Sequence, residues 1–285
     1  MMASKKIRFL CDSTCDLPPE LIEQHHVTVV PCFINQGSNS FPDDGTQEFR
    51  DGFYRDIPQM RPHPTTAAMS PGLAEEAILA AAKDADHLFI ITVATKLSGV
   101  YNAMRLGASR LPEGSWTLID SKSVTMGMGF QVLIGAEVAE ATGDIDKVKH
   151  AVMQVQQNQR VYAALETLEY LRRGGRVGWT AASLGTLLQI KPIIDVWDGE
   201  VHSIARVRTY ARAIDEMVDQ LEKHKPLDRV AVMYAKATDM VDQLVQRLQP
   251  VVPNKILITQ ITPTIGVHIG PSGLGVTVVS SAWRT

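Results

Sequence analysis

The sequence lacks the features that mark membrane proteins and nucleic-acid-binding proteins. No apolar run approaches the roughly 20 residues that cross a membrane, so we expect no stable membrane insertion. Basic residues are not in excess, because 28 Lys and Arg stand against 31 Asp and Glu, a net charge of -3. We therefore expect no nucleic-acid partner, since phosphate binding needs a basic surface. The first residues show no signal-peptide pattern, which favours a cytoplasmic location.

Cysteine is scarce: the three cysteines are Cys11, Cys15 and Cys32. An odd number without a secretory signal argues against a disulfide framework. Cys11 and Cys15 have the spacing C-x-x-x-C, but no second Cys/His pair follows at zinc spacing, so we expect no metal site. Small buried thiols are the simpler interpretation, and metal binding is the alternative.

The common catalytic motifs are also missing. There is no G-x-S-x-G, H-E-x-x-H or C-x-x-C, and GPSGLG (270–275) lacks the Lys-Ser/Thr ending of a P-loop. It lacks the spacing of a dinucleotide fingerprint as well. Because no nucleophile with its base is evident, we predict no catalytic residue and no cofactor. This absence favours a binding protein over an enzyme.

What the sequence does contain is a regular alternation of strand and helix patterns in its first half. The content of 45% hydrophobic and 21% charged residues is typical of a soluble globular protein. Hydrophobic strands that alternate with capped helices predict a parallel sheet covered on both faces, a Rossmann-like α/β/α domain. The expected strands are 6–11, 27–34, 87–94 and 115–121, and the expected helices are 70–85, 98–110 and 124–141.

The second half mixes hairpin and crossover connections. A hairpin is expected at 191–208, around the turn pair Asp198-Gly199. A length of 285 residues suggests two domains, and the polar end of an amphipathic helix at 142–160 suggests where they meet. We predict an α/β protein of two domains: a parallel α/β domain at 1–158 and a mixed-sheet α/β domain at 159–285.

Small polar residues and glycines gather where strands end or helices begin. Ligands of an open parallel sheet bind outside the carboxyl ends of its strands. Ser98 and Gly99 would open a helix there, whose free N–H groups and dipole attract an anion, and Thr66 would add a second hydroxyl. Each of these residues is equally typical of an ordinary helix cap. The four segments are 11–18, 64–72, 95–102 and 266–275.

Two further residues would bring charge to such a site. Arg176 lies in RRGGRVG and His268 in GVHIGPSGLG. The simpler interpretations are a helix C-cap followed by a turn for the first segment, and a structural histidine for the second.

Five segments, in order along the chain, resemble the motifs of the DegV family. DSTCDLP (12–18) is similar to the family's Asp-Ser-Thr-x-Asp-Leu signature, and TKLSGVYNAM (95–104) to its Leu-Ser-Gly-Thr-Tyr segment. The other three are PTTAAMSPG (64–72), LEYLRRGGRV (168–177) and GVHIGPSGLG (266–275). DegV proteins bind fatty acids, and some are the fatty-acid-binding subunit of a bacterial fatty acid kinase.

The resemblance implies two α/β domains, the EDD fold, with the acyl chain between them or within the second. It implies a long-chain fatty acid as ligand, with its carboxylate held by Thr66 and Ser98 and by the backbone of Gly99. It places Arg176 and His268 in the head-group vicinity. A fatty acid kinase catalytic subunit would act as partner in phospholipid metabolism by phosphorylating the bound carboxylate.

The sequence departs from the family pattern at two places. Ala67, Ala68 and Met69 stand where the family has Ser-Gln-Pro, which removes polar side chains beside the expected carboxylate. Ser272 is inserted in the last motif, four residues after His268, and could shift the position of that histidine.

A fatty acid requires a long apolar cavity. Burial of each methylene is worth about 0.8 kcal/mol, so roughly 15 methylenes contribute on the order of 12 kcal/mol before the costs of association. Met126 and Met128 are flexible enough to line such a cavity. The candidate walls are 124–130, 180–190 and 191–197, and ordinary core is the alternative for each.

Exposed arginines are the candidates for docking a kinase. Arg206, in IARVRT, matches a Lys/Arg-Val-Arg-Thr stretch of the family; Arg208, Arg172 and Arg173 are further candidates. Two other functions stay open. One is a stand-alone phosphotransferase or hydrolase for a small anionic substrate, with His268 as acid or base. The other is a regulator that senses lipid.

Overall fold

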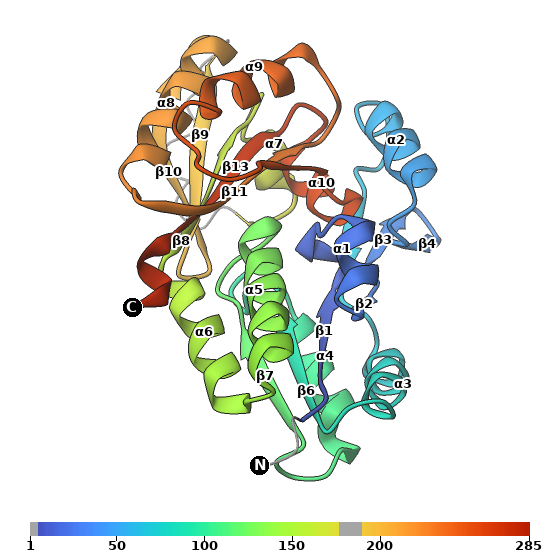
Figure 1. Cartoon of the computed structure of the whole chain (residues 1–285). Helices are drawn as coiled ribbons and strands as arrows, with labels where there is room; N and C mark the ends of the chain where they lie inside the picture. Colours follow the sequence, from blue (N-terminus) through green and yellow to red (C-terminus); the bar gives the residue numbers. More distant parts are fainter. Residues whose placement is uncertain (1–4, 177–189) are drawn as a thin grey trace.

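The structure, a computed structural model, describes residues 5–176 and 190–285 and contains a parallel and a mixed sheet. The first sheet is parallel throughout, in the order β2-β1-β6-β7. Helices α3 and α4 pack together on one face, and α5 and α6 pack together on the other (Figure 1). The predicted parallel α/β/α arrangement is confirmed. Its elements are β1 (Ile7–Asp12), α1 (Pro19–Gln24), β2 (Val27–Val30), α3 (Pro71–Ala82), β6 (His87–Thr92), α4 (Val100–Gly107), β7 (Trp116–Asp120), α5 (Met126–Thr142) and α6 (Ile145–Gln157).

The second sheet has six strands in the order β10-β9-β8-β13-β11-β12, and only β11 and β12 are parallel. The predicted hairpin is confirmed: Asp198 and Gly199 both have positive φ, 49° and 77°, as a two-residue turn of this kind requires. Helices α8 and α9 cover one face of the sheet. Its elements are β8 (Gln159–Ala164), α7 (Glu169–Arg173), β9 (Lys191–Trp197), β10 (Glu200–Val207), α8 (Tyr210–Glu222), β11 (Leu227–Tyr234), α9 (Asp239–Leu248), β12 (Leu257–Gln260), α10 (Pro263–Ile269) and β13 (Leu274–Ser280).

A small third sheet differs from the prediction. The expected strand 27–34 is broken after β2, because Pro31 cannot donate a ladder hydrogen bond, and the chain leaves the parallel sheet as β3 (Phe33–Gln36). Strand β3 pairs antiparallel with β4 (Asn39–Pro42) and β5 (Thr65–Ala67). Helix α2 (Gln47–Asp56) follows β4. Helix α10 was also not predicted.

Helix α5 lies between the two large sheets and contacts both. Its glycines make this close approach possible. A Cβ at Gly127 would lie 2.6 Å from Val161 Cγ2, and one at Gly129 would lie 2.6 Å from the Cys15 carbonyl oxygen. The predicted boundary at 158/159 falls in the turn before β8, and the division into two domains at this residue stays a prediction.

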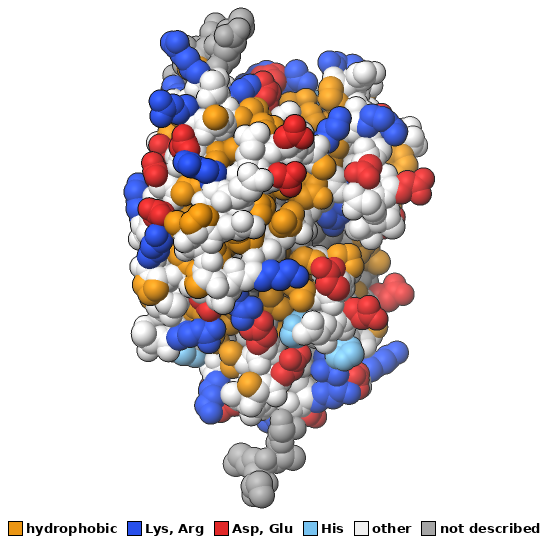
Figure 2. All heavy atoms as spheres, turned by 45° about the horizontal axis from the view of Figure 1, so that its top comes forward, with side chains coloured by type: hydrophobic (Ala, Val, Ile, Leu, Met, Phe, Trp, Pro, Cys, Tyr) orange, Lys and Arg blue, Asp and Glu red, His pale blue; other side chains and the backbone are white. Residues whose placement is uncertain are grey.

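The surface agrees with the balanced composition. On the face shown in Figure 2, basic and acidic side chains are interspersed, and hydrophobic side chains are visible between them. Within 5–176 and 190–285, no helix has both the length and the apolar content to cross a membrane.

Candidate ligand-binding site

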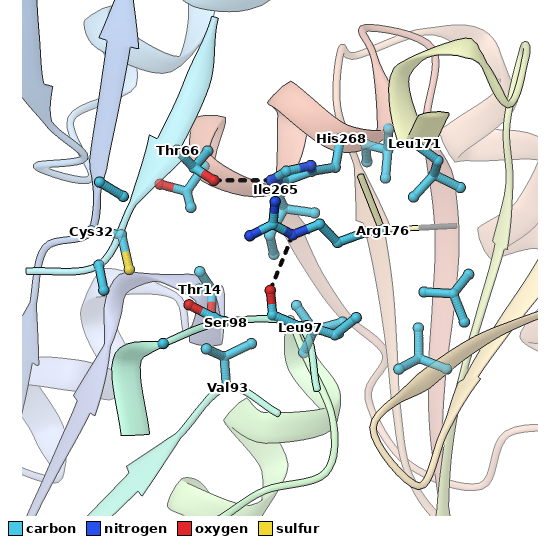
Figure 3. Close-up of a pocket in the computed structure, with 18 of the residues that line it drawn as sticks. Thr14, Cys32, Thr66, Val93, Leu97, Ser98, Leu171, Arg176, Ile265 and His268 are labelled. Atoms are coloured by element: carbon cyan, nitrogen blue, oxygen red, sulfur yellow. Dashed lines mark hydrogen bonds between the residues drawn. The ribbon is translucent and has the colours of Figure 1, made fainter. Parts of the chain in front are cut away.

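A cavity of about 330 Å³ lies between the carboxyl ends of the parallel strands and the six-stranded sheet. Figure 3 shows Thr66, Cys32 and Ser98 on one side of it and Leu171 on the other. The polar residues that line it are Thr14, Thr66, Ser98, Arg176, Thr264 and His268, and among the apolar ones are Val93, Leu97, Val124, Leu171, Ile194, Val196, Val201 and Ile269. The structure therefore brings five of the predicted site residues to one cavity, since Gly99 lines it too.

Ser98 and Gly99 reach the cavity because β6 ends at the ligand-binding edge of the parallel sheet. Helix α4 begins directly after Gly99. The Ser98 hydroxyl accepts a bond of 3.4 Å from the Val100 N–H, which leaves its own proton free to donate to a ligand. A Cβ at Gly99 would meet nothing within 4 Å, so its backbone faces open space.

The Thr66 hydroxyl is held by a histidine that is distant in sequence. Thr66 is the middle residue of β5, and its Oγ1 lies 3.0 Å from His268 Nε2. Two of the three residues that depart from the family pattern, Ala67 and Ala68, line the cavity, whereas Met69 is buried in the core. This side of the cavity therefore has fewer side-chain donors than the family motif would supply.

His268 is a neutral imidazole. Burial, together with the positive charge of Arg176 and the proximity of His63, lowers its pKa to about 3. Its ring packs so closely on the 171–176 turn that a Cβ at Gly174 would overlap it. If Nε2 carries the proton, it donates to Thr66 Oγ1, and the Thr66 hydroxyl then has its proton available for a ligand oxygen.

Arg176 ties the turn after α7 to the loop that carries Ser98. Its Nε donates to the Leu97 carbonyl at 3.1 Å and its Nη1 to the Gly174 carbonyl at 2.6 Å. Its guanidinium reaches into the space between the Thr66–His268 pair and the Leu97–Ser98 segment (Figure 3). It therefore brings positive charge beside both hydroxyls.

The β9–β10 hairpin supplies three of the apolar residues that line the cavity. Ile194 and Val196 belong to the predicted wall 191–197, and Val201 faces them from β10. The prediction for Met126 and Met128 was wrong: both are fully buried in the core at the start of α5, and only Val124 of that segment lines the cavity. The predicted wall 180–190 lies, except for Ile190, outside the described residues.

The hairpin is anchored at its turn to the loops that follow β6 and β7. Lys122 Nζ lies 2.7 Å from Asp198 Oδ1, and Lys96 Nζ lies 2.9 Å from Glu200 Oε1. The Gly199 N–H donates to the Lys122 carbonyl at 2.8 Å. These contacts join the apolar wall to the segment that holds Ser98.

All three cysteines are free and buried, as predicted. Burial raises the pKa of the Cys32 thiol well above its usual value, and a hydrogen bond with Cys15 together with burial does the same for Cys11. Cys32 lines the cavity. In the described part of the chain, no group of three or more His, Cys, Asp or Glu side chains is placed to hold a metal ion.

Sequence reasoning found His268 but missed the helix α10 that carries it, and with it Thr264 and Ile265. Thr264, Ile265 and His268 lie on this helix and line the cavity. The pair Thr262-Pro263 was the available signal, because proline is favoured at the first position of a helix. Thr14 was also missed, although it lies in the first motif.

A family model described as "Uncharacterised protein, DegV family" matches residues 6–281. The chain belongs to the DegV family. A DegV domain-containing protein of Streptomyces coelicolor is 31% identical over 283 residues, which are 97% of this chain and 99% of the relative. The resemblance seen in the motifs is confirmed.

Solved DegV structures have the same fold. One, a DegV family protein from Thermus thermophilus described by its fatty-acid binding, is 28% identical, with a TM-score of 0.89 over 96% of this chain and 99% of that one. Another, a stearic-acid-binding protein from Eubacterium ventriosum, is 21% identical, with a TM-score of 0.88 over 98% of this chain and 100% of that one. The second comparison supports the fold alone.

Proposed function

We propose that this DegV protein binds a long-chain fatty acid in the cavity between its two large sheets. The observation that carries the proposal is a single cavity with hydroxyls at one side and aliphatic side chains over most of the rest. Its volume of about 330 Å³ falls in the range of small-molecule sites. The fatty-acid binding of the Thermus thermophilus relative supports the same ligand class.

The head group would be held by neutral donors beside one cation. Thr66 and Ser98 donate their hydroxyl protons to the carboxylate, the Gly99 backbone lies within reach, and Arg176 adds positive charge. Each hydrogen bond to a charged group is worth roughly 1.5–3 kcal/mol. Because a tail of many methylenes contributes more, the tail dominates the affinity and the hydroxyls set the orientation.

The site suits a carrier better than an enzyme. A general acid or base works best when its pKa is near the operating pH, and His268, with a pKa of about 3, is far below it. We infer that a partner kinase phosphorylates the presented carboxylate and forms the acyl phosphate. A lipid-sensing regulator would bind the same ligand without such a reaction.

The binding proposal is tested by the lipid that the purified protein retains. We expect mass spectrometry of an organic extract to find a long-chain fatty acid at close to one per chain. Thr66→Val and Ser98→Ala each lower the affinity for palmitate about tenfold, because each removes one charge-assisted hydrogen bond. Thr65→Val, next to Thr66 on β5, and Ser109→Ala, on the surface, are the matched controls. Full retention in both site variants contradicts the assignment.

The docking proposal for the kinase concerns Arg206. This exposed arginine lies on the edge strand β10, opposite Pro192 of β9. Since side chains alternate along a strand, Pro192 lies on the same sheet face as Ile194 and Val196, which line the cavity. Arg206, directly opposite Pro192, therefore lies on that face as well. Arg172 and Arg173 are weaker candidates, because both bond to Glu169.

Arg206→Ala is expected to leave palmitate affinity within twofold and to lower acyl phosphate formation by a fatty acid kinase subunit severalfold. The reason is that the substitution removes a positive charge from the docking face without touching the cavity. The measurement is acyl phosphate formed from palmitate and ATP, with Arg105→Ala, an exposed arginine of α4, as the control. Equal rates for Arg206→Ala and the unsubstituted protein would remove the idea.

A further inference from the structure

Helix α10 supplies the residues of the proposed carboxylate site that lie nearest the C-terminus of the chain. His268, Thr264 and Ile265 line the cavity from this helix. Thr262, the residue before α10, makes no side-chain cap of its own. Something else must satisfy the free N–H groups at the start of the helix.

Asp43, in the loop before α2, takes this role from far away in the sequence. Its Oδ2 accepts the Thr264 N–H at 3.1 Å and also accepts the Thr262 hydroxyl proton. Figure 1 shows α2 and β3 beside α10, which explains how the loop reaches the start of the helix. Asp43 is 1% exposed and is not among the residues that line the ligand cavity.

Neighbouring side chains hold the rest of the segment that leads into α10. Asp16 Oδ1 accepts the Thr262 N–H at 2.7 Å, and the Tyr54 hydroxyl donates to the Ile261 carbonyl at 2.9 Å. The Arg50 guanidinium donates to the Gln260 carbonyl. The start of α10 is therefore fixed by the N-terminal half of the chain.

We propose that Asp43 is a positioning residue for the carboxylate site and acts through α10 by holding His268 in hydrogen-bond contact with Thr66. This inference rests on the proposed function. The helix is seven residues long, about two turns, so a displacement at its first residue is carried to His268. The Thr66–His268 bond has an ordinary length of 3.0 Å, and a displacement of roughly 0.6 Å would break it, since a contact of about 3.6 Å is no longer a hydrogen bond.

Hydrogen-bond geometry, rather than negative charge, is what the helix requires of Asp43. Burial raises its pKa, against the hydrogen bonds from Thr262 and Thr264 and the charge of Arg50. Its Oδ1 has no hydrogen-bond partner among the described residues, and both bonds to the helix region use Oδ2. An asparagine can place its amide oxygen at the same position, whereas alanine cannot.

The test compares two ligands that share a tail and differ in head group. Palmitate carries a carboxylate, and hexadecanol does not. We expect Asp43→Ala to weaken palmitate binding about tenfold, because the Thr66 hydroxyl is no longer aligned with the carboxylate. Hexadecanol, which has no carboxylate, is expected to change in affinity less than twofold. Asp43→Asn is expected to stay within twofold of the unsubstituted protein for both ligands. Asp44→Ala, the exposed neighbour, is the control.

Two results would overturn the inference. One is an equal loss of affinity for palmitate and hexadecanol in Asp43→Ala, which would show that the substitution destabilises the whole cavity. The other is an unchanged affinity for palmitate in this variant. If Asp43→Ala does not fold, Asp43→Ser, whose shorter side chain cannot make both bonds, is measured in its place with the same expectations. Absence of palmitate binding by the unsubstituted protein would instead overturn the proposed function.

Discussion

If the cavity holds a fatty acid as proposed, a phenylalanine in place of Val196 is expected to shorten the preferred acid. Val196 lies on β9, pairs with Val161 and Val201, and lines the apolar part of a cavity of about 330 Å³. The larger side chain would occupy space equal to three or four methylenes of a tail. At about 0.8 kcal/mol each, the loss for palmitate is about 3 kcal/mol, or roughly a hundredfold in affinity. The affinity for decanoate is expected to change little, because we expect its shorter tail to end before the hairpin.

The measurement is a competition series of saturated acids from ten to eighteen carbons. Val207→Phe is the matched control, because Val207 lies on β10 but packs against the cluster under α8 instead of lining the cavity. The preferred length moves to shorter acids in Val196→Phe and stays unchanged in the control. The same loss at every chain length would show that the tail does not run toward the hairpin.

The sequence predicted those parts of the fold that depend on local patterns. Strand–helix alternation indicated the parallel sheet, and the turn pair Asp198-Gly199 indicated the hairpin. Ser98 and Gly99 were found for the same reason, since the carboxyl end of a buried strand is recognisable locally.

Contacts between distant segments were beyond this reasoning. Thr66 and His268 are 202 residues apart, and each reaches the other through an element that the local patterns did not reveal, β5 for the first and α10 for the second. Met126 failed as a cavity residue for a related reason, because the periodicity of α5 does not show that both sheets cover it. Reasoning from the residues and the motif resemblance both assigned Thr66 and His268 to one site, but neither predicted the bond between them.

The buried carboxylate of Asp16 has a cost that depends on pH. Burial raises its pKa to about 7, against the opposing effects of Arg50, Thr125 and Thr262, while the charge of Asp43 adds to the rise. In the unfolded chain its pKa is about 3.9. The stability due to neutral Asp16 is therefore fully present below pH 4 and is lost as the pH rises through 7.

Asp16→Asn removes this dependence and keeps the fold. An asparagine amide oxygen can accept the Thr262 N–H, and asparagine tolerates the positive φ of 51° at this position. We expect the free energy of unfolding of the variant, relative to the unsubstituted protein, to rise by about 3 kcal/mol between pH 5 and pH 8. His268 and the other titrating groups are common to both proteins, so their contributions cancel in this difference.

Urea unfolding at several pH values measures this difference, with Asp44→Asn as the control at an exposed carboxylate. A difference that is the same at pH 5 and pH 8 would mean that Asp16 stays ionised throughout, with its negative charge fully compensated by Arg50 and the Thr262 N–H. The predicted slope would instead show that the protein accepts a buried, proton-dependent cost at a residue that bonds to Thr262, directly before α10. Because Thr262 leads into the helix that carries His268, that cost lies in the segment that precedes the proposed carboxylate site.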